Sequence, residues 1–196
     1  MPTELPELIV SRAVLWSDWL AVNAESSAGV WLVLAKKGTT EPTSLTYDEA
    51  LEEALCHGWI DGQVARRDAA TFRQRFTPRR ARSAWSKRNV ALAERLAREG
   101  RLRPAGAAAI EAAKADGRWE RAYAGSATVE VPADLLSALA AEPEAAAMFE
   151  RLSAQNRYAI LHRIHEAKRS ETRERRIATY VQMLARGETL HPQRDR

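Results

Sequence analysis

The chain contains little of what several familiar kinds of site require. Its one cysteine, Cys56, excludes an intramolecular disulfide. Its nine glycines form no phosphate-binding loop, and no Gly-x-Ser-x-Gly nucleophile elbow occurs. No apolar run approaches the roughly 20 residues that a membrane-spanning helix needs. The first residues are acidic before they are apolar, so we expect no secretory signal and a cytoplasmic location.

Positive charge is what the chain concentrates in one place. Residues 62–103 hold 13 Lys/Arg against 3 Asp/Glu, although all 196 residues together carry a net charge of only +4. Aromatic side chains interleave with these arginines, from Trp59 through Phe76 to Trp85. A local excess of this size is typical of a surface that meets an anion.

The first part of the chain predicts a small sheet. The apolar run 29–35 has the length of a strand. Residues 59–66 and 70–76 predict the two strands of a hairpin that turns at 67–69. In the second of these strands, aromatic and polar residues alternate with arginines, which is the period of a half-buried strand.

Two helices are expected beside these strands. Ser17 has the side chain to cap a short helix over residues 18–25. Thr46 and Glu49 have the spacing of a capping box, and the helix that they open is expected to run to His57.

Beyond residue 85 the pattern is helical, with proline or serine at most of the expected helix starts. The sequence therefore predicts an α+β fold: a small antiparallel sheet with helices in the N-terminal part, followed by a helical C-terminal part. The expected boundaries are an α+β domain over 1–122, a linker over 123–131, a helical domain over 132–187 and a flexible tail over 188–196.

The basic segment supplies a candidate binding cleft. Arg73 and Arg75 share one face of the second predicted strand, and guanidinium groups suit bidentate binding of phosphate or carboxylate. The helix start at Ser86 adds free amides and the positive end of a helix dipole. Nearby indole rings can stack a base or another flat ring. The predicted cleft is lined by Trp59, Asp61, Arg75, Arg79, Arg80, Trp85, Ser86, Lys87 and Asn89.

Each part of this cleft also has a simpler interpretation. The arginines can form a solvated face, and Trp59 and Trp85 can belong to the core. Asp61 follows the start of the predicted hairpin, where its carboxylate can hold the sheet through an ion pair, contact a ligand, or act as an acid or base.

Two other groups of reactive residues are weaker candidates. Cys56 and His57 are neighbours on a predicted helix and point about 100° apart, so they cannot form a thiol–imidazole pair, and we expect Cys56 in the core. His162 lies at helical spacing from His165 and Glu166, but nothing supplies the further ligand that a metal site needs. We expect no metal and no other cofactor.

Several strings along the chain resemble a known family, in the order in which that family has them. They include Gly29-Val30-Trp31-Leu32, Trp59-Ile60-Asp61-Gly62, Thr77-Pro78-Arg79-Arg80, Trp85-Ser86-Lys87-Arg88-Asn89, Ala167-Lys168 and Glu171-Thr172-Arg173. They resemble the YdeI/OmpD-associated family, whose members are described as bacteriocin-protection or antimicrobial-peptide-resistance proteins. That family more usually has Phe at the position of His57. The resemblance implies fold relatives and a protective role, and it brings no catalytic residue set.

Three functions follow as hypotheses. The first is a protein whose cleft binds a small anionic or aromatic ligand, or an acidic protein partner, and which by resemblance protects against antimicrobial agents by binding or sequestration. The second is a single-stranded nucleic-acid-binding protein, which the basic and aromatic residues suit although no known binding module is recognisable. The third is a small-molecule enzyme that uses Asp61 with arginines as an anion clamp.

Overall fold

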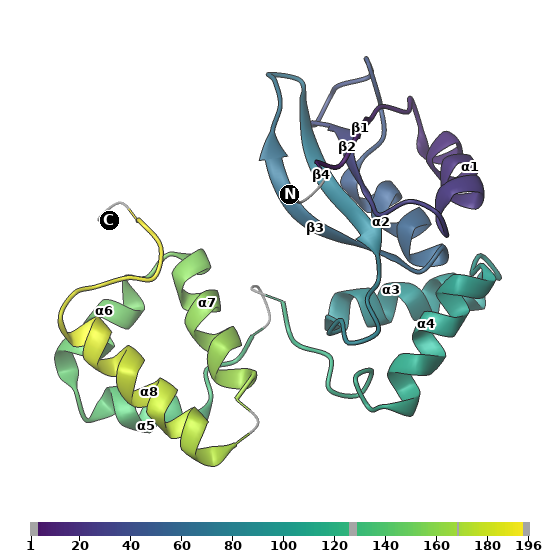
Figure 1. Cartoon of the computed structure of the whole chain (residues 1–196). Coiled ribbons are helices and arrows are strands. Elements are labelled where there is room, and N and C mark those ends of the chain that lie inside the picture. Colours follow the sequence, from purple (N-terminus) through teal and green to yellow (C-terminus); the bar gives the residue numbers. More distant parts are fainter. Residues whose placement is uncertain (1–3, 126–128, 168, 194–196) are drawn as a thin grey trace. The chain divides into compact units, whose positions relative to one another are not determined.

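Among the described residues, all strands lie in the first of two units of the chain. The computed structural model describes residues 4–125, 129–167 and 169–193, and it divides the chain into residues 1–122 and 123–196 (Figure 1). The first unit combines a sheet with helices, and the described part of the second is helical. The predicted α+β class is confirmed. No helix in these described ranges is long and apolar enough to cross a membrane.

The first unit contains a four-stranded sheet in the order β1-β2-β4-β3. The pairs β2–β4 and β4–β3 are antiparallel, as predicted, while β1 adds a parallel pair with β2 through Glu7 and Trp31. The elements of this unit are β1 (Glu7–Leu8), α1 (Ala13–Asn23), β2 (Val30–Ala35), α2 (Tyr47–Cys56), β3 (Trp59–Arg66), β4 (Thr71–Pro78), α3 (Lys87–Arg98) and α4 (Pro104–Ala115).

The two predicted helix starts differ in outcome. Thr46 and Glu49 form the expected capping box, in which each side chain accepts a hydrogen bond from the other residue's backbone N–H. The predicted start at Ser17 is wrong, since α1 begins at Ala13 and contains Ser17 in its interior. Trp16 and Leu20, one helical turn apart, are fully buried, so burial of an apolar stripe determines this helix rather than a side-chain cap.

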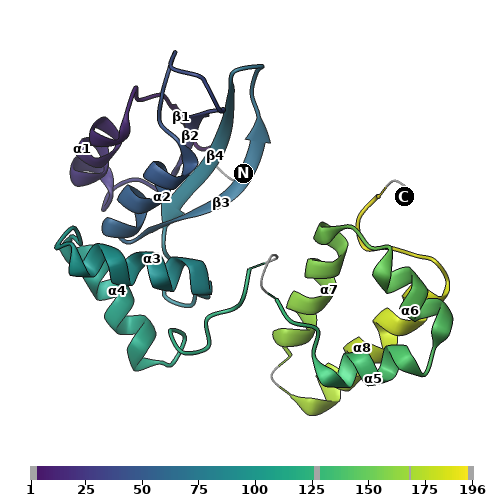
Figure 2. The same cartoon turned by 180° about the vertical axis from the view of Figure 1, so that it is seen from behind.

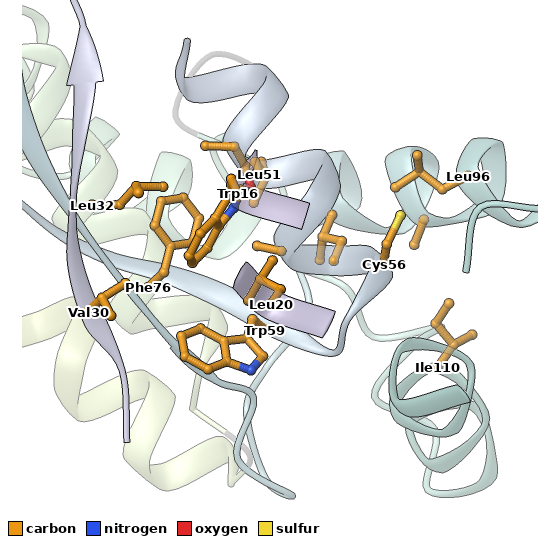
Figure 3. Close-up of a cluster of buried hydrophobic side chains, with 14 of the residues drawn as sticks. Trp16, Leu20, Val30, Leu32, Leu51, Cys56, Trp59, Phe76, Leu96 and Ile110 are labelled. Atoms are coloured by element: carbon orange, nitrogen blue, oxygen red, sulfur yellow. Dashed lines mark hydrogen bonds between the residues drawn. The ribbon is translucent and has the colours of Figure 1, made fainter. Parts of the chain in front are cut away.

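One face of the sheet and helices α1 and α2 enclose the core of the first unit. Trp16 and Leu20 of α1 pack in one cluster with Leu32 of β2, Trp59 of β3 and Phe76 of β4 (Figure 3). Both views of the chain show α1 and α2 on this side of the sheet (Figures 1 and 2). We call the opposite side of the sheet the open face.

Arg95 in α3 and Arg101 just beyond it bind carboxylates of α2. Arg101 pairs with Glu52 at 2.7 Å and with Glu53 at 2.6 Å, and Arg95 pairs with Glu52 at 2.5 Å. Burial of Glu52 raises its pKa, but hydrogen bonds and charge from Arg101 and Arg95 together outweigh this effect and lower the pKa. Part of the positive charge between residues 62 and 103 is therefore neutralised internally.

The described residues of the second unit form four helices around an apolar cluster of their own. Phe149, Ile160, Leu161, Ile164 and Leu184 are among its buried residues. Ser153 caps the helix that ends at His165, and Lys168 lies outside the described residues. The elements of this unit are α5 (Ala133–Ala140), α6 (Pro143–Glu150), α7 (Ala154–His165) and α8 (Ser170–Ala185).

Arg173 and Arg176 fasten these helices to one another. Arg173 donates from Nε and Nη2 to the two carboxylate oxygens of Asp134, at 2.5 and 2.9 Å, and from Nη1 to the carbonyl oxygen of Ile164 at 3.1 Å. Arg176 donates to the carbonyl oxygen of Arg163. Both arginines thus satisfy carbonyls at the end of α7, and one reaches α5 as well.

The segments around the second unit's helices make contacts of their own. The amide of His191 donates to Oδ1 of Asn156 at 2.8 Å, and Nδ2 of Asn156 donates back to the carbonyl of His191 at 2.9 Å. Asn156 is fully buried, so these bonds fix the chain beyond α8. His191, in the expected tail, is thus bound to α7. Residues 194–196 of that tail, like residues 126–128 of the expected linker, lie outside the described part. Val129 and Val131 pack against the second cluster.

Candidate functional site

The hairpin of β3 and β4 determines which side chains reach the open face. Phe76 is fully buried among the helices, so its neighbours Arg75 and Thr77 point to the other side of the sheet. The strand register pairs Thr77 with Ile60 of β3 and Arg75 with Trp31 of β2. These residues form one end of the open face.

A β-bulge shapes the edge of this surface. The register between β3 and β4 shifts between Asp61 and Val64, and Nε2 of Gln74 compensates by donating to the carbonyl oxygen of Gly62 at 2.8 Å. A Cβ atom at Gly62 would lie 3.0 Å from Nε of Arg75. The absence of a side chain at this position therefore lets the guanidinium of Arg75 lie against β3.

An open cleft of about 620 Å³ lies at this end of the hairpin. It combines two arginines and two hydroxyl side chains with four apolar side chains, Leu5, Ala28, Ile60 and Pro78. Its lining residues are Leu5, Ala28, Ile60, Asp61, Gly62, Arg75, Thr77, Pro78, Arg80 and Ser83. Three of the nine predicted site residues, Asp61, Arg75 and Arg80, are in this set.

Arg75 is the most informative member of the cleft. Its side chain is half-buried, and its Nε is buried without a hydrogen-bond partner in the described residues. Nor does Arg75 take part in an ion pair there. A buried donor on a charged group costs free energy unless a partner satisfies it, and a phosphate, sulfate or carboxylate group is the natural partner of a guanidinium. Arg80 is exposed in the same cleft and carries the same charge.

Asp61 borders the cleft, but its carboxylate is engaged on the helix side. Its register partner is Phe76, which places both side chains on the core face of the sheet. Oδ2 of Asp61 accepts a 2.9 Å hydrogen bond from the hydroxyl of Tyr47, in the first turn of α2. This contact favours the structural interpretation of Asp61.

Two of the predicted aromatic residues lie in the core. Trp59 is 1% exposed and donates from Nε1 to the carbonyl of Ala24 at 3.1 Å. Trp85 is 2% exposed and meets Trp119 edge to face, with 4.8 Å between the ring centroids. Neither indole lines the cleft, so the interpretation of these tryptophans as core residues applies.

Arg79 also lies outside the lining of the cleft. Its guanidinium lies 3.7 Å from the ring centroid of Trp85, and its Nη1 donates to the carbonyl of Ala84 at 3.0 Å. A cation over an indole face is a stabilising arrangement in its own right. Arg79 therefore fastens the loop that follows β4 to the core.

The start of α3 is formed as predicted but does not line the cleft. Ser86 caps the helix, and its hydroxyl oxygen accepts from the amide of Asn89 at 3.1 Å. The side chain of Asn89 is buried, and that of Lys87 is exposed. Of the nine predicted residues, these three stand apart from the three in the cleft.

The other reactive groups of the chain behave as core or surface residues. Cys56 is 2% exposed, and burial, followed by the charge of Glu53, raises the pKa of its thiol to about 11. His162 faces Glu166 at 3.8 Å. Within the described ranges, no three His, Cys, Asp or Glu side chains gather where they would hold a metal ion.

Sequence reasoning missed the cleft residues Thr77, Ser83 and Leu5. Thr77 had a usable signal, because it continues the alternation of Arg73 and Arg75 on the same strand face. Ser83 and Leu5 gave none, since their places depend on how distant segments meet the sheet.

Comparison with protein families divides the chain in a similar way to the two units. The model described as "Domain of unknown function (DUF8412)" matches residues 8–109, more than half of the chain. The chain belongs to that family. The cleft and the hairpin lie within the DUF8412 segment, apart from Leu5. A second model, described as "Bacteriocin-protection, YdeI or OmpD-Associated", matches residues 128–187, which confirms the YdeI/OmpD-associated resemblance for this segment. No curated protein and no solved structure matched the chain.

Proposed function

We propose that the first unit binds a ligand with an anionic group, which Arg75 and Arg80 hold in the cleft. The buried, unpartnered Nε of Arg75 carries this proposal. The hydroxyls of Thr77 and Ser83 are further hydrogen-bond donors for the same group. Leu5, with the nearby Ala28, Ile60 and Pro78, offers an apolar or flat part of the ligand a surface to pack on.

The physiological role that fits this cleft is protection against antimicrobial agents by binding, in the cytoplasm. It is supported by the YdeI/OmpD-associated match of the second unit. The local positive charge opposes direct capture of a cationic peptide. The two arginines suit a small anionic ligand that accompanies antimicrobial stress, or an acidic protein partner, better than they suit a cationic peptide.

Calorimetric titration of the full chain with inorganic phosphate, pyrophosphate, benzoate and a nucleoside monophosphate tests the proposal. We expect saturable binding of at least one probe and a loss of roughly 10-fold or more in affinity in Arg75→Ala/Arg80→Ala, because each charged hydrogen bond contributes about 1.5–3 kcal/mol. The matched control is Lys37→Ala/Arg98→Ala, which removes two exposed positive charges elsewhere in the unit. Equal losses in both variants, or no binding of any probe, would overturn the proposal.

A further inference from the structure

The basic surface continues along β4 beyond the cleft. Arg73 lies two residues before Arg75 and shares the open face with it, since alternate residues of a strand point to the same side. Trp31 of β2 is the register partner of Arg75 and is partly exposed. The guanidinium of Arg73 lies 5.5 Å from the centroid of the Trp31 ring. The tryptophan thus stands beside two arginines on one face of the sheet.

Both arginines keep an unsatisfied donor. Nε of Arg73 and Nε of Arg75 are buried, and neither makes a hydrogen bond within the described part of the chain. Arg73 has a long contact from Nη1 to Glu7 at 3.5 Å, and Glu7 is bound more closely, at 3.1 Å, by Arg67. Glu7 is therefore shared between two arginines, and Arg67 also pairs with Asp68 at 2.6 Å. Arg75, which has no ion pair in the described residues, supplies the uncompensated positive charge next to Arg73.

The spacing of these groups points to a chain of anions. Two residues along an antiparallel strand advance about 6.8 Å, so a single small anion cannot bind both guanidinium groups at once. Consecutive phosphates of an extended strand span such a distance. The partly exposed Trp31 adds a flat apolar surface, which a phosphate chain without rings would leave unused.

We propose that the ligand of the cleft is a short segment of single-stranded nucleic acid. This inference rests on the proposed function and extends it: one phosphate lies on Arg75 and Arg80, the next lies on Arg73, and a base packs against Trp31. Some RNA-binding domains stack bases on aromatic residues of a four-stranded sheet, on the face away from their helices. The comparison with this sheet is an analogy of architecture. In this complex the phosphate replaces Glu7 as the partner of the Arg73 guanidinium.

The test compares three probes at several salt concentrations. They are a labelled single-stranded oligonucleotide of about ten nucleotides, the matching mononucleotide and inorganic polyphosphate of similar charge. We expect affinity to rise from mononucleotide to oligonucleotide. In Arg73→Ala, the slope of log affinity against log salt should become shallower by about 0.7, the change for one phosphate contact of a single strand. Arg98→Ala removes an equal charge from α3 and should leave the slope unchanged.

Variants of Trp31 test whether the bases of the ligand, and not only its phosphates, contact the protein. Trp31→Leu should weaken the oligonucleotide by roughly 5- to 100-fold and leave polyphosphate binding unchanged, while Trp31→Phe restores part of the loss. The unfolding midpoint of each variant is measured by circular dichroism, so that a folding defect is recognised, and Trp31→Phe then carries the comparison.

The outcomes distinguish this inference from the proposed function. If the mononucleotide binds through Arg75 and Arg80 but neither length nor Arg73→Ala changes the affinity, the proposed function stands and the nucleic-acid inference is wrong. Polyphosphate that binds as tightly as the oligonucleotide, with no effect of Trp31→Phe or Trp31→Leu, also overturns it. If none of the three probes binds, the nucleic-acid inference is wrong, and the proposed function stands only if benzoate or another of its own probes binds through Arg75 and Arg80.

Discussion

The hydroxyl of Tyr47 donates a 2.9 Å hydrogen bond to Oδ2 of Asp61 and so ties the first turn of α2 to β3. Burial, followed by the negative charge of Asp61, raises the pKa of Tyr47 to about 12, so the hydroxyl keeps its proton at neutral pH. Nη1 of Arg88 approaches the same hydroxyl oxygen at 3.5 Å, and Arg88 also pairs with Asp48 at 2.6 Å. The contact therefore joins a strand and the starts of two helices.

Loss of either partner of this bond should destabilise the first unit. We expect Tyr47→Phe and Asp61→Ala each to lower the free energy of unfolding by about 1–2 kcal/mol, and the double variant to lose less than the sum. Asp61→Asn keeps an acceptor and should cost less. Urea unfolding followed by far-UV circular dichroism measures these values. An Asp61→Asn protein with unchanged stability and ligand binding, but with a lost catalytic turnover, would instead favour the enzymatic hypothesis.

Gly106 allows α4 to approach the end of α2. A Cβ atom at this position would lie 2.2 Å from the carbonyl oxygen of Cys56 and 2.8 Å from that of Leu55, and these backbone atoms cannot yield without moving a helix. Gly106→Ala should therefore lower the free energy of unfolding by about 3 kcal/mol or more. Gly125→Ala is the control, since nothing lies within 4 Å of the added atom. Equal stability of the two variants would show that α4 does not pack this closely against the end of α2.

His57 should make the stability of the first unit sensitive to mild acid. The side chain is 6% exposed, and burial, followed by the charge of Arg103, lowers its pKa below the ordinary value of 6.5. The unfolded chain takes up a proton near pH 6.5 while the folded His57 stays neutral. Its contribution to stability is therefore complete above pH 6.5 and is lost as the pH falls towards the lower pKa of the folded state.

The measurement compares the wild type with His57→Phe at about pH 7.5 and about pH 5. Because the other titrating groups are common to both proteins, the difference between their losses of unfolding free energy isolates this histidine. We expect the wild type to lose more on acidification. Parallel losses would mean that the imidazole is protonated in the folded state.

Replacement of Arg173 should destabilise the second unit. It binds both oxygens of Asp134 and a carbonyl of α7, and a lysine ammonium cannot reproduce that fork. We expect Arg173→Lys to lower the free energy of unfolding by about 1–3 kcal/mol, measured by thermal unfolding in far-UV circular dichroism. Arg175→Ala, an exposed neighbour on α8, is the matched control. A smaller effect of Arg173→Lys than of Arg175→Ala would contradict this role.

The elements that could be predicted from the sequence are those governed by local rules. The alternation of Phe72 and Phe76 with Arg73 and Arg75 gave the second strand of the hairpin, and the Thr46 capping box gave a helix start, because both patterns depend on residues close in sequence. The two-residue β1 has no such pattern. It forms only because the start of the chain meets the edge of β2.

The composition of the cleft was only partly predictable for the same reason. A basic segment indicated Arg75 and Arg80, but it gave equal weight to Arg79, which stacks on Trp85. Whether an indole is buried or presented depends on which face of the sheet the helices cover. Trp59 therefore became core, while Trp31, in an otherwise buried strand, remained partly exposed.

The placement of the tryptophans means that only one of the two units contributes tryptophan fluorescence. All six tryptophans belong to the first unit, and three of them, Trp16, Trp19 and Trp59, are in ring contact with one another. The second unit has tyrosines and a phenylalanine but no indole. Intrinsic indole emission therefore monitors the first unit alone, while the helical ellipticity sums both. Any offset between the two transitions in one denaturation experiment reports how independently the two units unfold, without cutting the chain.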